Sequence, residues 1–585
     1  MEVAGFGVGV VTAVGLLGQI FDGCVKAYSY FTAASNLGKD SDRMVCKIRI
    51  EEMRLMVWGR EWGVTEGKLE AHLAASSGDN DGLKKLAEMI LKQLLDTIGN
   101  TKKLKERYGV KEESSVVAGQ EKAPRKQAEL PGCTSTWGEL RLRARWVVAD
   151  KEKFDMLLRD LKDYNDGLER LFPLSRIATL HRTWTNELLQ TAKRDMSQLH
   201  LLEAASSGIY PQLNNCASLK QLRINLDAQE STKFKPTSAL KIPKHKLEYP
   251  TDSSSDRVEG LYQDGAEGSP IPVIIEWACY DDDSDLDSRL LIYQRVDNLA
   301  RMVHSASNRH PDLHTLDCLG YLDDTQNKRY GLTYTVPSSS PSPSLSTNSQ
   351  PASFPTLRTL TSLIEDPQLR NPDLDARLQL AHTLAVALWS FHSLDWLHKS
   401  FSSTNILFFT KRDPSTSTSA TPSLSHPYLT GFTTSRPSSL VEMTSPPPTA
   451  NTGGRPASDL YRHPSSLGIW RQSYRHHFDI YSLGLVLLEI GLWKSLSRDF
   501  WKPKYTSATF RDKAVLPVLV PGLGSKTGSR YRRVVERCLR YADDVDDDDD
   551  GDESASKTDE VKLKGVEEQG KMLEWVVSVL ESLKV

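Results

Sequence analysis

The first third of the chain places apolar residues at helical spacing. Over residues 81–108, Leu83, Leu86, Ile90, Leu94 and Ile98 recur every three or four positions, which is the period of one helix face. Further apolar stripes of this kind predict helices over residues 44–58, 140–172 and 175–205. Residues 110–131 are polar without a period and predict a loop. Helices with complementary apolar stripes indicate an all-α helical bundle, which we assign to residues 1–210.

The extreme N-terminus is apolar throughout. Residues 3–21, VAGFGVGVVTAVGLLGQIF, carry no charge, and as a helix they would span about 28 Å, close to the hydrocarbon thickness of a bilayer. The residues that such a helix would offer to a membrane are Val3, Phe6, Val10, Val14, Leu17 and Phe21. Its glycines weaken an isolated helix, so the alternative is the buried first helix of a soluble bundle.

Two stretches near the N-terminus resemble a known fungal family. They read EVAGFGVGVVTAVGLLGQIFDGCVKAYSYF and GKDSDRMVCKIRIEEMRLMVWGREWGV, and the pairs Arg54-Leu55, Trp58-Gly59 and Trp62-Gly63 carry most of the likeness. Both are similar to the start of HeLo (prion-inhibition and propagation) domains. The resemblance implies a helical cell-death effector whose N-terminal segment attacks a membrane when it is released. It also implies contact with anionic lipid, for which basic residues such as Lys84 and Lys85 are candidates, with a solvated face as the alternative.

The second half of the chain mixes strands with helices. Residues 211–257, polar in their second half, are expected to form a linker. Ile271–Cys279 is a continuous apolar run that is typical of a buried strand. A helix over 285–305 and strands over 316–322 and 330–336 complete a small lobe, which we assign to residues 258–337.

A Ser- and Pro-rich insertion over residues 338–356 separates this small lobe from a larger one over 357–585. The larger lobe contains a predicted helix over 376–389, then His398-Lys-Ser-Phe-Ser-Ser-Thr-Asn405, then an apolar strand over 406–409. This spacing resembles the catalytic loop of protein kinases, His-Arg-Asp-x-x-x-x-Asn. The resemblance implies a multidomain chain, in which an all-α bundle precedes an α+β bilobal protein-kinase-like domain.

A second stretch supports the same resemblance. Phe478-Asp479-Ile-Tyr-Ser482-Leu-Gly484, ending at Glu489, is similar to the long central helix of the larger kinase lobe. In kinases the Asp of this helix accepts hydrogen bonds from the backbone of the catalytic loop. The resemblance therefore gives Asp479 a structural role and says nothing about activity.

The positions that carry kinase chemistry are substituted. Ser400 stands where kinases have the catalytic Asp, and a neutral hydroxyl cannot accept the proton of the attacking group. Gly431-Phe432-Thr433 stands where kinases have Asp-Phe-Gly, so the metal-binding carboxylate is replaced by Gly431. The next acidic residue in the sequence is Glu442, so we expect no carboxylate near Asn405.

Two of the remaining loop residues have structural interpretations. Asn405 is the one residual candidate for a metal or nucleotide contact, and stabilisation of the loop by its amide is the alternative. His398 is expected to pack against Phe432, as the corresponding residues do in kinases. A nucleophilic couple of His398 with Ser400 is disfavoured, because side chains two residues apart on a loop seldom reach hydrogen-bonding geometry.

The phosphate-binding parts of a kinase are also missing from the small lobe. The nucleotide-binding Lys is expected at Ala278, and Glu276 is expected to face solvent from its strand. The segment from Arg257 to Gly265 is the one candidate for a Gly-rich loop, but it lacks Gly-x-Gly-x-x-Gly and is interpreted as a surface loop. The acidic run over 543–552 lacks the spacing of a calcium loop and predicts a solvated loop.

Composition adds a few limits. The chain of 585 residues is 39% hydrophobic and 25% charged, as in soluble proteins with two or more domains. A net charge of -3 gives no case for nucleic-acid binding. Scattered cysteines without a Cys-x-x-Cys pair predict a reducing compartment without disulfides or a zinc site. No basic residue precedes Lys26, so no signal peptide is expected and the cytoplasm is the predicted location.

These patterns lead to two functional hypotheses. The first is a pseudokinase-regulated HeLo effector of fungal cell death or incompatibility, which attacks membranes conditionally and has protein partners or associates with itself. The second is a kinase-like signalling scaffold, with an atypical ATP-binding kinase as a weaker variant. We expect no enzyme activity, no metal and no resident cofactor, and the sequence leaves open whether ATP and magnesium bind.

Overall fold

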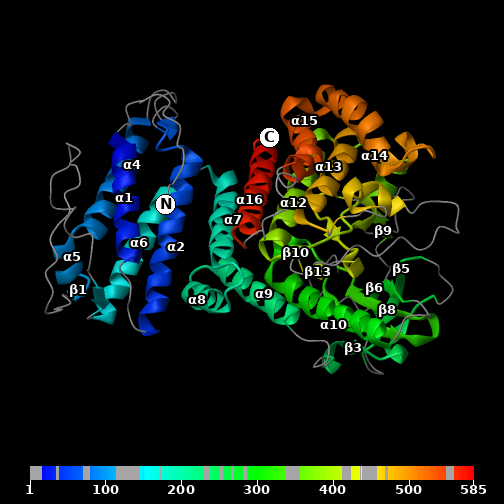
Figure 1. The fold of residues 1–585 in the computed structure, drawn as a ribbon, viewed down its shortest axis with the longest axis horizontal. Helices are drawn as coiled ribbons and strands as arrows, with labels where there is room; N and C mark the ends of the chain where they lie inside the picture. Colours follow the sequence, from blue (N-terminus) through cyan, green and yellow to red (C-terminus); the bar gives the residue numbers. More distant parts are fainter. Residues whose placement is uncertain are drawn as a thin grey trace, which may run out of the picture. The chain divides into compact units, whose positions relative to one another are not determined.

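A computed structural model describes most of the chain. The described residues are 16–33, 39–69, 80–113, 145–148, 150–171, 173–228, 236–250, 255–264, 269–280, 286–337, 356–410, 423–434, 436–437, 457–467, 472, 474–547 and 559–584. The chain divides into two compact units, Met1–Ala217 and Ser218–Val585. Figure 1 labels many of the elements of both.

The first unit is mainly helical. Its helices are α1 (Leu16–Ala33), α2 (Lys39–Trp62), α4 (Asn80–Gly99), α5 (Thr101–Glu106), α6 (Lys151–Glu169), α7 (Leu174–Ala192), α8 (Met196–Ser206) and the first part of α9 (Pro211–Asp227). Helix α1 packs against α2 and α4, while α2 also packs against α6, α7 and α8. The predicted stripe of α4 is right only in its second half, because Leu94 and Ile98 are buried whereas Leu83 and Leu86 are exposed.

The prediction of an all-α bundle is wrong at one point. Strand β1 (Val110–Glu113) pairs antiparallel with β2 (Arg145–Val148), in segments expected to be a loop and the start of a helix. Trp146, Val147 and Val148 favour an extended backbone, because aromatic and β-branched side chains pack well on a pleated surface. Two predicted long helices are also divided, since Asn100 caps α5 and Asp195 caps α8 through their side chains.

The predicted membrane-active residues lie partly within the described chain. Val3, Phe6, Val10 and Val14 fall outside the described residues. Leu17 and Phe21 lie on α1 and are buried in the bundle. Among the helices that the structure describes, none has the length and apolarity required to cross a membrane.

The second unit contains a six-stranded sheet in the order β3-β7-β8-β6-β5-β4, in which the β3–β7 pair is parallel and the other pairs are antiparallel. Its strands are β3 (Lys241–Ile242), β4 (Leu247–Glu248), β5 (Arg257–Tyr262), β6 (Ile271–Cys279), β7 (Cys318–Asp324) and β8 (Arg329–Thr335). Helix α10 (Leu286–Arg309) packs against β7 and β8.

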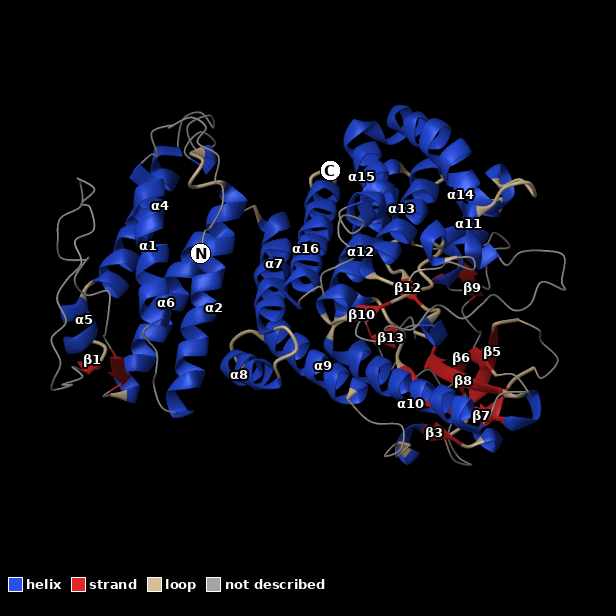
Figure 2. Cartoon of the chain, in the orientation of Figure 1, coloured by secondary structure: helices blue, strands red, loops and turns tan. Residues whose placement is uncertain are grey.

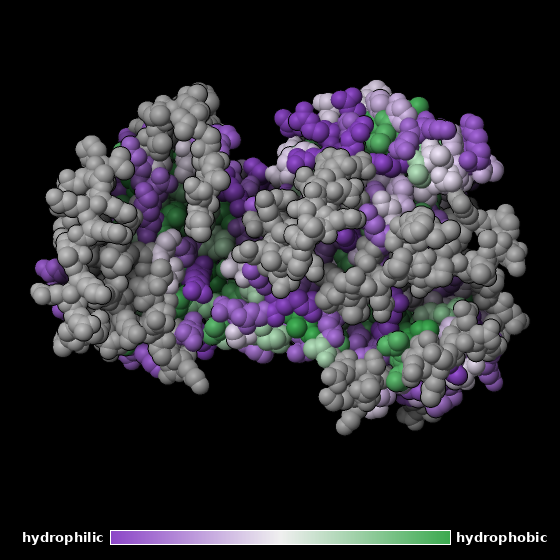
Figure 3. Space-filling model, viewed as in Figure 1, coloured by the Kyte–Doolittle hydropathy of each residue, from purple (hydrophilic) through white to green (hydrophobic). Residues whose placement is uncertain are grey.

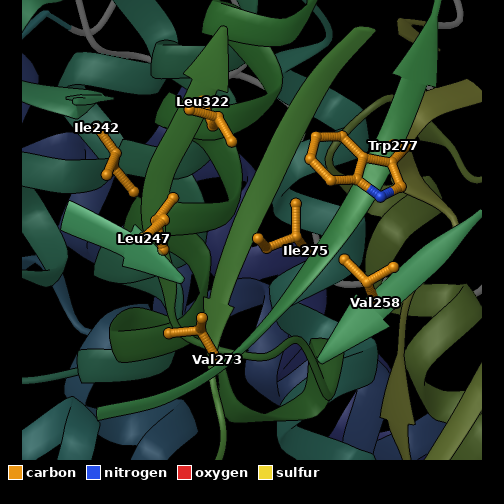
Figure 4. Packing of buried hydrophobic residues seen from close by; sticks show 7 residues of the cluster. All are labelled: Ile242, Leu247, Val258, Val273, Ile275, Trp277 and Leu322. Atoms are coloured by element: carbon orange, nitrogen blue, oxygen red, sulfur yellow. The ribbon is translucent and has the colours of Figure 1, made fainter. Parts of the chain in front are cut away.

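The expected linker over 211–257 contributes to this sheet. Its first part forms α9, and its last part supplies β3 and β4, the two edge strands. Figure 4 shows Ile242 and Leu247 packed in one hydrophobic cluster with Val258, Val273, Ile275, Trp277 and Leu322. These edge strands have too few residues to show a hydrophobic period. The polar composition around them therefore led to the prediction of a linker.

The rest of the second unit is mostly helical. It contains α11 (Leu360–Glu365), α12 (Leu374–Ser393), α13 (His476–Leu492), α14 (Ser507–Phe510), α15 (Val520–Asp547) and α16 (Asp559–Glu581). Short strands form the sheet β12-β11-β9 (Tyr428–Leu429, Ile406–Thr410 and Thr356–Thr359) and the pair β10 (Trp396–Leu397) with β13 (Arg436–Pro437). Figure 2 shows the six-stranded sheet set apart from α13 and α15. Nearly every residue of α13 is buried, including the polar residues His476, His477, Asp479 and Glu489.

Helix α15 has one buried and one exposed face. Tyr531, Val535 and Cys538 are buried against the core, whereas Arg533 and Arg537 are exposed. Figure 3 shows a mainly hydrophilic surface over α14 and α15. The helix runs on to Asp547, so the first part of the acidic run over 543–552 is helical and not the predicted loop.

Candidate functional site

The loop from His398 to Asn405 is held by a buried carboxylate. Asp479 of α13 has 0% exposure and accepts hydrogen bonds from the backbone N–H groups of His398 (2.8 Å) and Lys399 (2.9 Å), and from the hydroxyl of Tyr474 (2.7 Å). Burial alone would raise the pKa of Asp479, but hydrogen bonds and nearby His392 and His398 lower it. These donors also stabilise Lys399 at a φ of 69°, in the left-handed region.

His398 and Phe432 form a ring contact, as the sequence predicted. Their centroids lie 5.1 Å apart, and Phe391 and Trp396 pack against the same phenyl ring. Burial lowers the pKa of His398 to about 4. Its Nδ1 faces the backbone N–H of Ser400, so the imidazole is a buried neutral acceptor and is poorly suited to act as a general base for a solvent-borne substrate.

The side-chain amide of Asn405 is engaged on both sides. Its Nδ2 donates to the carbonyl of Ser400 (2.8 Å), and its Oδ1 accepts from Nη2 of Arg257 (2.9 Å). The oxygen that would have to bind a metal therefore faces a guanidinium group. A second cation at this oxygen would meet like-charge repulsion, so the geometry favours the loop-stabilising interpretation of Asn405.

Gly431 leaves no room for a carboxylate. Its φ of 89° lies in the left-handed region that favours glycine, and a Cβ atom there would come within 2.4 Å of Nδ2 of Asn405. An Asp at this position would be strained and would collide with the asparagine. The close approach of the two segments therefore depends on the absence of a side chain at Gly431.

Glu276 corrects two expectations. It was expected to face solvent, with no carboxylate near Asn405, but its side chain is 3% exposed and lies beside Gly431. Its oxygens accept hydrogen bonds from the backbone N–H groups of Gly431 (3.0 Å) and Thr433 (3.3 Å). Trp277 belongs to the cluster of Figure 4, so the alternation of side chains along β6 directs Glu276 to the opposite face.

Arg257 and Glu276 were both missed as site residues. They are direct partners in the antiparallel pair of β5 with β6, so their side chains leave the sheet side by side. Arg257 was expected in a surface loop, but it begins a strand and reaches Asn405. Cross-strand register is a tertiary property, and no local sequence signal reports it. Ala278, the expected Lys position, lies two residues beyond Glu276.

The structure thus brings Ser400, Asn405 and Gly431 together and adds Arg257 and Glu276 to them. Every contact that it shows in this cluster is structural: two side chains of the sheet hold two segments of the helical part. Within the described residues no group of three or more His, Cys, Asp or Glu side chains is arranged to hold a metal ion.

The first unit is centred on Arg54, which opens the motif that carried the HeLo resemblance. Arg54 is 2% exposed and forms ion pairs with Glu51 (3.0 Å), Asp166 (2.7 Å) and Glu169 (2.8 Å), joining α2 to α6. Its Nη1 also donates to the hydroxyl of Tyr210 (2.8 Å). Burial acts to raise the pKa of all three carboxyl groups. Hydrogen bonds from neighbouring side chains outweigh burial at Asp166 and Glu169, so the pKa of each is lowered. At Glu51 burial dominates and the pKa is raised.

The rest of the motif explains why α1 lies where it does. Trp58 donates from Nε1 to the carbonyl of Leu168 (2.9 Å), which fixes the indole between α2 and α6. Gly59 leaves space for the ring of Phe21, since a Cβ atom there would lie 2.0 Å from Cζ. The last described apolar residue of the N-terminal segment is therefore inserted into a socket that only glycine provides.

Comparison with known proteins assigns both units. The family model described as HeLo, prion-inhibition and propagation, matches residues 5–202, so the N-terminal part carries a HeLo domain. The model described as DUF7580, a domain of unknown function, matches residues 276–581.

Two curated relatives come from Podospora anserina. Heterokaryon incompatibility protein S is 24% identical over 220 residues, which cover 36% of this chain and 73% of that protein. Heterokaryon incompatibility protein s is 22% identical over 221 residues, covering 36% and 74%. The HeLo prediction is confirmed, whereas the kinase-like nature of the second unit stays a prediction.

Proposed function

The chain belongs to the DUF7580 family, and we propose that it is an effector of programmed cell death or incompatibility. In this proposal the HeLo domain attacks an anionic membrane with its N-terminal segment. The DUF7580 region acts as a pseudokinase that controls when the segment is released. The protein is cytoplasmic until activation and reaches the membrane afterwards.

The observation that carries the effector role is the docking of α1. Leu17 and Phe21 are apolar residues of the segment that would enter a membrane, and both are buried against the bundle. The contact of Phe21 with Gly59 is a close steric fit, because the ring occupies the space that a Cβ atom at Gly59 would need. Closely packed interiors switch between distinct arrangements and do not deform gradually. Docking of this kind therefore suits a segment that is either held in the bundle or released from it.

The pseudokinase role is supported by two features of the second unit: the contacts that hold a kinase-like loop are present, and the residues expected to carry catalysis are substituted. Asp479 holds the backbone of the loop from His398 to Asn405 as the corresponding Asp does in kinases. The positions for the base and the metal ligand are Ser400 and Gly431, and Arg257 occupies the oxygen of Asn405. We infer that the unit transmits conformational signals and does not transfer phosphate.

Vesicle leakage tests the effector role. The full chain, a fragment of residues 1–228 that ends after α9, and each protein lacking residues 3–21 are added to dye-filled vesicles with and without anionic lipid. We expect the fragment to release dye from anionic vesicles, the full chain to release much less, and both deletions to be inactive. A folded fragment that leaves anionic vesicles intact would overturn the effector role.

A second candidate is a signalling scaffold without membrane action. The hydrogen bonds of Arg257 with Asn405 and of Glu276 with Gly431 favour this candidate. They hold the sheet against two other segments of the second unit without a bound ligand, so the unit could present a rigid surface to partners. Partners captured on the full chain that remain bound after deletion of residues 3–21, together with inactivity on vesicles, would select this candidate.

A further inference from the structure

Several histidines are buried around α13 in the described part of the second unit. His476 and His477 are the first two residues of α13, His463 stacks on Phe478 with ring centroids 4.9 Å apart, and His398 lies on the loop that Asp479 holds. Their exposures are 8% or less. We call His398, His463, His476 and His477 the histidine cluster. None of their imidazole rings has a role in the proposed function.

The contacts of the cluster suit neutral imidazoles. Nδ1 of His463 accepts from the backbone N–H of Ser465 (3.2 Å), as Nδ1 of His398 does from Ser400 (3.4 Å). A proton added to either atom would meet an N–H group where it needs an acceptor. The Nε2 atoms of His463 and His476 are buried and have no partner among the described residues. The proton of an imidazolium would therefore lose its hydrogen bond to water without replacement.

The charges that face the cluster come from several elements, and most of them disfavour protonation. Lys220 of α9 faces His476, Arg511 faces His463, and Arg475 faces His477. His392 of α12 contacts His476 with centroids 4.7 Å apart, so charging one of these rings opposes charging the other. The positive end of the α13 dipole lies at His476 and His477. Asp479 is the carboxylate that favours a charged ring, and it faces His398, His392 and His476.

We propose that the second unit is a proton-sensitive switch, which opens at α13 and the Asp479 loop as the pH falls from 6 toward 5. The input is the proton itself, and the sensor is the histidine cluster. The proposal adds a physical trigger to the account above, and it can fail without affecting the effector role of the HeLo domain.

The direction and size of the effect follow from proton linkage. Burial lowers the pKa of His463 and His477 to about 3 and that of His398 to about 4, and it lowers the pKa of His476 well below its usual value. A base with a depressed pKa in the folded state stabilises the fold above the unfolded value, roughly 6.5, and this stability is lost as the pH falls. Each histidine of the cluster then adds a proton on opening.

One buried acid acts in the opposite direction. Glu489 of α13 accepts from Tyr461 (2.8 Å) and from the backbone N–H of Leu496 (2.8 Å), and burial raises its pKa to about 7. It is protonated in the fold near pH 5.5 and loses that proton on opening. Four histidines less one glutamic acid leave a net uptake of about three protons, so the opening constant should rise several hundred-fold, roughly, between pH 6 and pH 5.

Hydrogen exchange of the full chain measures this directly. Peptides that cover residues 391–405 and 474–492 are followed from pH 7 to pH 5, and the rates are corrected for the intrinsic pH dependence of exchange. We expect the opening constant to rise several hundred-fold between pH 6 and pH 5. A rise of tenfold or less would overturn the proposal, and this measurement on the unmodified protein needs no variant.

A variant pair assigns the effect to the cluster. His463→Asn keeps an acceptor for Ser465 and removes one titrating group, so the rise should become about tenfold smaller. His245→Asn changes an exposed histidine of the same unit and should leave the rise unchanged. Where His463→Asn does not fold, His477→Phe serves as the second variant. Equal effects of the cluster and control substitutions would contradict the proposal.

Discussion

The Arg54 cluster of the first unit and the Asp479 cluster of the second are both centred on one buried charge, and the chain satisfies the two in different ways. Arg54 is surrounded by opposite charges on α2 and α6, so the ion pairs join two helices directly. Asp479 is surrounded mainly by neutral donors, two of which are backbone N–H groups of the loop after β10.

The difference shows what each unit has to keep fixed. In the HeLo domain, ion pairs between side chains join the helices. Substitution of one charged residue is therefore expected to lower the stability of the domain. In the second unit a buried carboxylate instead fixes the backbone of a loop through its N–H groups. The backbone contacts of Asp479 therefore fix this loop whatever side chain stands at Ser400.

The largest expected effect comes from Arg54→Met, which removes the charge and keeps most of the volume. It leaves three carboxylates without their common cation, and breaking a buried pair in this way costs about 3–5 kcal/mol. Urea denaturation of the full chain should show this loss in the first unit. Arg60→Met on the same helix removes a partly exposed pair with Glu187 and should cost about 1 kcal/mol or less. Equal costs would remove the contrast between buried and exposed pairs.

Asp479→Asn should have the next largest effect. The amide keeps the shape, but it has one acceptor oxygen and no charge, so hydrogen bonds from His398, Lys399 or Tyr474 weaken. The cost should be about 2–3 kcal/mol, as expected for hydrogen bonds to a charged group. Hydrogen exchange should locate the loss at the amides of His398 and Lys399. Unchanged protection of these amides would show that the loop does not depend on Asp479.

Gly59→Ala tests the socket for Phe21. The added methyl group cannot coexist with the ring, so α1 must shift at a cost of about 1–3 kcal/mol. We expect the full chain to release more dye from anionic vesicles, because α1 is held less firmly. Gly82→Ala is the matched control, since a Cβ atom there meets nothing within 4 Å. If the two variants behave alike, α1 is not held by this contact.

Gly431→Ala probes the close approach to Asn405. The positive φ alone costs about 1 kcal/mol for a residue with a Cβ atom, and the collision with the amide adds to it. Gly67→Ala isolates the first part of this cost, because its φ is 71° and no atom lies within 4 Å of the added methyl group. Thermal unfolding of the two variants should differ by the cost of the collision. No difference would mean that Asn405 can move aside freely.

Much of the fold could be predicted from periodicity. Helix α12, strand β6 and strand β11 lie within a few residues of their predicted bounds, because long apolar patterns report burial directly. The HeLo motif was informative since Arg54, Trp58 and Gly59 each make a contact that few other residues can make. The short strands β2, β3 and β4 were missed, because two to four residues show no period.

The candidate site was predicted only where it is local in sequence. The loop from His398 to Asn405 and the segment at Gly431 were identified from spacing. Arg257 and Glu276 were not, since they lie far away in the chain and reach the loop through the register of β5 with β6. The sequence therefore indicated the two local segments of the site and could not indicate the residues of the sheet that contact them.

We propose that Arg257 occupies the oxygen of Asn405 that a metal would need, so that the second unit does not bind Mg-ATP. A calorimetric titration of the full chain with ATP, with and without magnesium, tests this claim most directly. We predict no magnesium-dependent binding at millimolar nucleotide, and the same result for Asn405→Ala. Magnesium-dependent binding that Asn405→Ala abolishes would contradict the account.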